Sequence, residues 1–115
     1  TEHIYLQGNT LVGIATPVFL EEHYRTYGII THYNPLPEQT DDTPLITASG
    51  EWVREGIVAN NCLRFGTLVR IENIIYEVQD RMNSRYNCRY FDIFSFNLEY
   101  AKKMGVKTKE VIIYR

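Results

Sequence analysis

Short runs of alternating polar and apolar residues recur along this chain and constrain its fold more than any other feature. The runs end at glycine, proline or asparagine, as strands joined by turns do. The expected strands are residues 11–15, 28–33, 56–60, 68–71, 74–79, 90–94 and 106–114. Because they do not alternate with helices, a parallel α/β sheet is excluded. A small closed barrel would remove the edges that such strands otherwise expose.

One short helix is expected between the last two strands. Ser95 can cap its start, and Gly105 follows its last apolar residue. Lys102 and Lys103 lie where the negative end of a helix dipole favours cations. The fold is therefore predicted to be mainly β with a helix near the C-terminus. Residues 1–26 show no clear period and are interpreted as an N-terminal extension or extra strand, and residues 27–115 as the barrel domain.

Composition narrows the function. With 115 residues the chain fits one domain, and its net charge of −2, with the cations interspersed among acids, argues against nucleic acid as a partner. No apolar run reaches the roughly 20 residues of a membrane span. Nine tyrosines and five phenylalanines are typical of strands or of a sugar-binding surface. Cys62 and Cys88 form no CxxC motif, so no metal site or cofactor is expected, and both cysteines are predicted to be unbridged.

Two aspartates stand out between residues 76 and 94. Asp80 and Asp92 each interrupt the period-two pattern of an expected strand, where an apolar or neutral residue would be ordinary. The segment 81–89 between them is polar, with three arginines, and suits a connection exposed to water. We expect the two strands to bring these carboxyl groups to one cleft.

Several ordered motifs carry a resemblance to a known family. They are TASG at 47–50, VREGIVA at 53–59, FGT at 65–67, QDRM at 79–82, RYFDIF at 89–94 and a closing S-x-x-x-E-Y-A-K-K-M-G. Over about residues 28–115 this succession resembles the 3D domain, which is named for three aspartates and also occurs in membrane-bound lytic transglycosylase A. The resemblance implies a six-stranded double-psi β-barrel.

The resemblance also implies roles for single residues. Asp92 matches the family's proposed catalytic acid/base, and Asp80 matches a second of its aspartates. The first aspartate would fall at Asn60 or Asn61, where this chain has none, and Arg81-Met82 replaces the family's glycines. The side chains expected to contact substrate are Thr47, Ser49, Arg81, Tyr86 and Tyr90.

The implied activity is that of a peptidoglycan lytic transglycosylase of bacterial or phage origin. Such an enzyme cleaves the β-1,4 bond between N-acetylmuramic acid and N-acetylglucosamine to a 1,6-anhydro product, and one aspartate can serve both proton transfers. Its pKa must be raised from about 3.9 by apolar surroundings or a second carboxylate. Hydrolysis by the same pair is a close alternative.

A rival interpretation is a non-catalytic barrel that binds peptidoglycan or another protein in a cell-wall or phage assembly. The asparagines at 60 and 61 and the Arg81-Met82 variant favour it. The expected partner is a peptidoglycan glycan strand, or another protein under the rival interpretation, and the expected location is extracytoplasmic. The chain begins at Thr1, so we expect a processed piece of a longer protein. Oligomeric state stays open.

Overall fold

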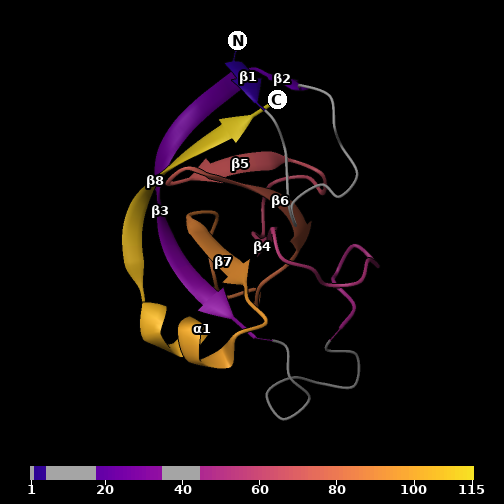
Figure 1. The fold of residues 1–115 in the computed structure, drawn as a ribbon, viewed down its shortest axis with the longest axis vertical. Helices are drawn as coiled ribbons and strands as arrows, with labels where there is room; N and C mark the ends of the chain where they lie inside the picture. The colour runs from indigo at the N-terminus through magenta and orange to yellow at the C-terminus, as the bar shows by residue number, and fades with distance from the viewer. Residues whose placement is uncertain (1, 5–17, 35–44) are drawn as a thin grey trace.

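Six strands close into a barrel in the computed structural model, which describes residues 2–4, 18–34 and 45–115 (Figure 1). Around the barrel the order is β3-β7-β4-β6-β5-β8. The bounds are β3 (Glu22–Tyr33), β4 (Ile57–Ala59), β5 (Leu68–Ile71), β6 (Ile74–Asp80), β7 (Tyr90–Phe94) and β8 (Lys107–Tyr114). The prediction of a mainly β chain with a closed barrel and one short helix is confirmed at this level. The strand predicted at residues 11–15 lies outside the described residues.

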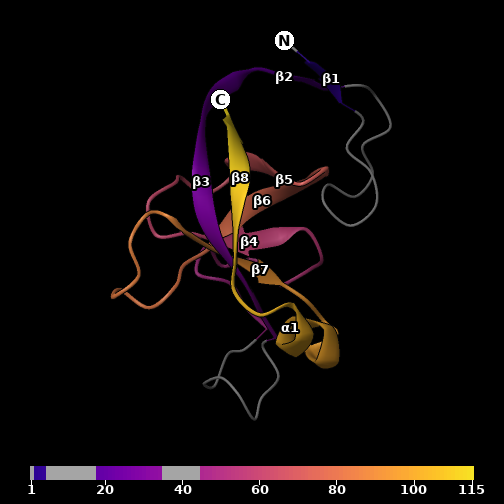
Figure 2. The same cartoon turned by 90° about the vertical axis from the view of Figure 1, so that its left-hand side faces the viewer.

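The barrel mixes parallel and antiparallel pairs. β3 pairs with β7 and β4 with β6 in parallel, and the other four neighbouring pairs are antiparallel. A separate two-stranded sheet, β1 (Glu2–Ile4) with β2 (Val18–Leu20), lies at the end of the molecule opposite the helix (Figures 1 and 2). The parallel pairs join strands far apart in sequence, so the fold is built from long-range contacts.

The core fills the inside of the barrel. Every strand of the barrel contributes at least one inward side chain, and the buried set is Ile30, Val58, Val69, Ile71, Val78, Phe91, Ile93, Val111 and Ile113. Gly28 in β3 has no room for a side chain, because a Cβ there would lie 2.7 Å from Cδ1 of Phe91 and 2.9 Å from Cγ2 of Val111. This glycine lets β3 approach the core closely.

β3 is longer than the sequence indicated. It begins at Glu22 and pairs with β8 from that residue onward, so the expected boundary between residues 26 and 27 falls inside the strand. Residues 22–27 are mostly exposed on both faces. Since neither face is buried, no apolar alternation exists there for a sequence pattern to reveal.

The helix α1 (Leu98–Met104) starts two residues later than the predicted cap implied. Asn97, not Ser95, caps it, with Oδ1 accepting the backbone N–H of Tyr100 at 2.9 Å. The Ser95 hydroxyl instead accepts the N–H of Asn97 at 3.1 Å and so shapes the turn before the helix. Gly105 follows α1 with a φ of 62°. None of the described helices is long and apolar enough to cross a membrane.

Candidate functional site

The two aspartates lie in one row across the barrel. Asp92 in β7 is the register partner of Ala59 in β4, and Ala59 is also the partner of Asp80 in β6. On the other side of Asp92, β3 contributes Thr31. Neighbouring strands are about 4.8 Å apart, so the Cα atoms of the aspartates, two strands apart, are separated by roughly 10 Å. Residues opposite each other in a sheet share a face, so both carboxyl groups project from the same face of the barrel.

A β-bulge puts Asp80 on this face. Val58 pairs with Val78, but the next residue of β4, Ala59, pairs with Asp80, so β6 carries one extra residue, Gln79. Without that shift Gln79 would face Ala59, and Asp80 would point into the core like Val78. Bulges re-aim side chains in this way and are frequent beside functional sites.

Three donors hold the carboxylate of Asp80. The backbone N–H groups of Ala48 and Arg81 both bond to Oδ1 at 2.9 Å, and the Tyr33 hydroxyl donates to Oδ2 at 2.8 Å. Burial, followed by the charge of Asp80, raises the pKa of Tyr33, so its phenol stays protonated and remains a donor. Asp80 is thereby fixed in position by its own neighbour, Arg81, and by two residues distant in sequence, Tyr33 and Ala48.

Asp92 is held far more loosely. Among the described residues, its side chain accepts one hydrogen bond, from the Thr31 hydroxyl to Oδ1 at 2.7 Å. Burial raises the pKa of Asp92 to about 6; the Thr31 hydrogen bond opposes this rise, and the charge of Asp80 adds to it. Near neutral pH this carboxyl group therefore has both of its protonation states accessible, which is the property that a general acid or base requires.

The TASG segment supports the site through its backbone more than through its hydroxyls. The amide of Ala48 binds Asp80, and the amide of Ser49 binds the carbonyl of Gln79 at 3.2 Å. The hydroxyls of Thr47 and Ser49 lie 2.9 Å apart, and Thr47 is buried, so the two predicted sugar contacts bond to each other. Gly50, with a φ of 91°, completes the turn that aims these amides at β6.

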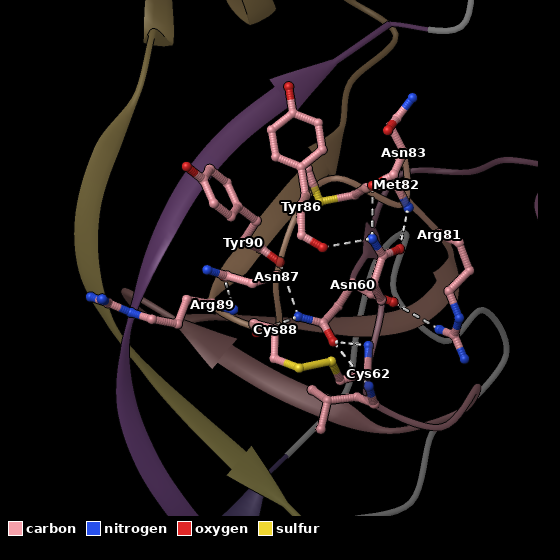
Figure 3. Close-up of a disulfide and its surroundings, with 12 residues drawn as sticks. Asn60, Cys62, Arg81, Met82, Asn83, Tyr86, Asn87, Cys88, Arg89 and Tyr90 are labelled. Atoms are coloured by element: carbon pink, nitrogen blue, oxygen red, sulfur yellow. Dashed lines mark hydrogen bonds between the residues drawn. A yellow bond between two sulfur atoms is a disulfide. The ribbon is translucent and has the colours of Figure 1, made fainter.

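The three predicted contact residues of the 81–90 loop occupy different places. The Arg81 guanidinium lies 3.9 Å from the centre of the Phe65 ring and donates to the carbonyl of Asn60 at 2.8 Å. Tyr86 and Tyr90 pack edge to face with ring centres 4.9 Å apart. Figure 3 shows the two rings side by side, with Arg81 on the other side of the loop.

Asn60 and Asn61 hold this loop in place. The Nδ2 of Asn60 donates to the carbonyls of Cys88 and Tyr90, and its Oδ1 accepts the N–H groups of Cys62 and Leu63 (Figure 3). In the same way, the Nδ2 of Asn61 donates to the carbonyls of Asn83 and Tyr86, and its Oδ1 accepts the N–H of Met82. A carboxylate at either position would turn an oxygen toward carbonyl oxygens, so these bonds require an amide at both positions.

A disulfide joins Cys62 to Cys88, so the prediction of unbridged cysteines is wrong (Figure 3). Their Cα atoms lie 5.4 Å apart, a usual spacing for a bridge. The hydrogen bonds of Asn60 to both cysteine backbones bring the two segments together. Nothing in the spacing of two cysteines reveals such a long-range approach.

Thr31 and Tyr33 are the site residues that sequence reasoning missed. Both project from β3, and the only signal was their position in the strand 28–33, two residues apart on one face. Among the described residues, no group of three or more histidines, cysteines and acids is placed to hold a metal ion.

Comparison with known proteins does not assign the chain to a family. No known family model matches this chain, and no curated protein matches it.

Proposed function

We propose that this chain is a glycan-cleaving domain of the lytic transglycosylase kind, with Asp92 as its acid/base. The observation that carries the proposal is the state of the Asp92 carboxyl group. Its pKa is raised to about 6, mainly by burial, and Thr31 is the one described side chain that donates to it. A group of this kind can give a proton in one step and take one in the next.

The proposed reaction uses that property twice. Protonated Asp92 donates its proton to the oxygen of the β-1,4 bond between N-acetylmuramic acid and N-acetylglucosamine as the bond breaks. The resulting carboxylate then removes the proton of the muramoyl 6-hydroxyl, which attacks the anomeric carbon to give a 1,6-anhydro product. Because the acid form must be present at the start, activity is expected to fall as pH rises above about 6.

Asp80 takes the role of the fixed carboxylate. Its negative charge raises the pKa of Asp92 and would favour an oxocarbenium-like transition state over the neutral ground state. Its three hydrogen bonds keep that charge in place while Asp92 changes its protonation. Preorganised charge of this kind needs no rearrangement during the reaction.

The fold and location are part of the same proposal. We assign the barrel to the double-psi class and the 3D domain, supported by its six strands, its two parallel pairs and the motif order. The Cys62–Cys88 disulfide supports an extracytoplasmic location, since disulfides persist in oxidising compartments. Peptidoglycan is the substrate that this assignment implies.

One observation favours a second candidate, a non-catalytic barrel that binds peptidoglycan or a protein. Asn60 and Asn61, at the place of the family's first aspartate, are fully engaged in holding the 81–90 loop. This chain therefore has only two of the family's three aspartates. At the place of the first one, the asparagine side chains stabilise the loop instead.

Product analysis decides between these candidates. The purified protein is incubated with peptidoglycan and the soluble products are identified by mass spectrometry, beside Asp92→Asn and the control Glu110→Gln, which removes a distant exposed carboxylate. We expect anhydro-muropeptides from the wild type and the control and none from Asp92→Asn. Products with reducing ends would show that the enzyme is a hydrolase and not a transglycosylase. Retained binding to peptidoglycan without any soluble product would establish the binding module.

A further inference from the structure

A surface pocket of about 450 Å³ is lined in part by α1. This helix covers one end of the barrel (Figure 1). Residues from β3, β6, β7, α1 and the turn before β4 line the pocket, and neither Asp80 nor Asp92 is among them. Its size is within the range of pockets that bind small molecules, and barrel mouths are frequent positions for such sites.

The pocket is lined by one histidine, His32, and one acidic residue, Glu55. Burial, with the positive charges of Lys107 and Lys109, lowers the pKa of His32, and its Nδ1 is enclosed without a hydrogen-bond partner among the described residues. The imidazole is therefore neutral. Glu55 is the acidic residue of the lining, and its one hydrogen bond within the described residues is a long one, 3.5 Å from the N–H of Phe96. An acid with so few contacts has lone pairs to offer to a ligand.

Aromatic side chains line the same pocket as this carboxylate. Tyr76, Phe94 and Tyr100 line the same pocket, and Tyr100 packs edge-on against His32 with ring centres 5.6 Å apart. Burial raises the pKa of Tyr76 to about 12, and the charges of Tyr100, Glu72 and Glu55 contribute further. The phenol of Tyr76 thus stays neutral and lies within electrostatic reach of Glu55 and Tyr100. Glu72, by contrast, is paired with Lys109 at 2.9 Å.

We propose that this pocket binds a small organic ammonium ion. A carboxylate beside aromatic faces attracts a cation through both charge and the ring quadrupole. The ammonium would donate to Glu55 and the phenol oxygen of Tyr76, and its hydrocarbon part would pack on Ile74 and Tyr100, which are 52% and 47% exposed at the rim. The site is separate from the aspartate row and does not depend on the activity proposed for it.

The test compares a cation with its neutral counterpart of equal shape. Cyclohexylammonium chloride and cyclohexanol are each titrated into the isotopically labelled protein at constant ionic strength, and amide shifts are followed by NMR. We expect saturable shifts at Glu55, Tyr76 and Tyr100 with the ammonium ion and much weaker ones with the alcohol. Equal affinity for both compounds would overturn the ammonium assignment, and no shift at these residues would overturn the site.

Two variants make the test specific. Glu55→Gln keeps the shape and removes the charge, so affinity for cyclohexylammonium should fall about tenfold or more. Glu110→Gln removes an equal charge elsewhere and should bind as the wild type does. Thermal unfolding confirms that both variants are folded. Unchanged affinity in Glu55→Gln, or an equal loss in Glu110→Gln, would contradict the proposal.

Discussion

At the scale of single residues, Asp92 is held at a cost to the folded state. Its pKa is about 6 when folded and 3.8 in the absence of the fold, so the folded protein binds the proton more tightly. The stability that Asp92 contributes is therefore fully present below pH 4 and is lost as pH rises through 6. Such a cost is common where a residue serves chemistry, because stability and function compete there.

Asp92→Asn should accordingly stabilise the protein at pH 8, by about 2 to 3 kcal/mol, because an amide can accept the Thr31 hydroxyl without a buried charge. Urea unfolding at pH 4 and pH 8 measures this. The variant should gain stability at pH 8 and little at pH 4. An Asp92→Asn protein that is less stable than the wild type at pH 8 would show that the carboxylate is not desolvated.

Asn60 offers a second test at this scale. Asn60→Asp should lower the free energy of unfolding by at least about 3 kcal/mol, because a buried carboxylate would face the carbonyls of Cys88 and Tyr90. Chemical unfolding at pH 7 gives the value. Asn87→Asp is the matched control: its Oδ1 accepts the N–H of Arg89, a bond that a carboxylate keeps, so its stability should change by less than about 0.5 kcal/mol. Similar losses in both variants would show that the Asn60 amide bonds are unimportant.

At the scale of elements, the sequence predicted those features that depend on the residue pattern within a single strand. The two aspartates were visible because each broke an alternation within its own strand. β5 to β8 were visible from partial alternation of buried and less buried residues, and β4 from a short apolar run that is buried throughout. Thr31 and Tyr33 were not found, since the aspartates to which they donate hydrogen bonds lie 61 and 47 residues away in the sequence. The bulge at Gln79 was equally hidden, because register depends on the neighbouring strand.

The close passage of β3 over the core gives a prediction for an element. Gly28→Ala should destabilise the protein by about 1 to 3 kcal/mol, because the added methyl group overlaps Phe91 and Val111. Thermal or urea unfolding measures the loss. Thr108→Ala, at an exposed position of the adjacent β8, is the control and should change stability little. Equal stability of Gly28→Ala and the wild type would mean that β3 can move away from the core without cost.

At the scale of the whole molecule, one disulfide joins the loop between β6 and β7 to Cys62, in the segment that follows β4. The bridge closes a chain segment with a sequence separation of 26, which corresponds to about 3.5 kcal/mol in the chain-entropy account. The same loop is bound by the amides of Asn60 and Asn61, so covalent and hydrogen-bonded restraints act on it together.

The double variant Cys62→Ser/Cys88→Ser should lose about 3.5 kcal/mol of stability and should show faster amide exchange between residues 83 and 90. Hydrogen exchange with mass spectrometry resolves the loop from the barrel. Wild-type protein treated with a reductant should behave as the variant does. Exchange that is unaltered in the loop would show that the asparagines suffice to hold it.

The row formed by Thr31, Asp92, Ala59 and Asp80 also bears on how the chain folds. Its members come from four strands, β3, β7, β4 and β6. Strands that pair with each other in this row are never consecutive in the sequence. Hairpins such as β5–β6 can form early, but this row exists only once β7 has inserted between β3 and β4. Proton uptake by Asp92 near pH 5 would then accompany the insertion of β7, and the kinetics of that uptake would time this step of folding.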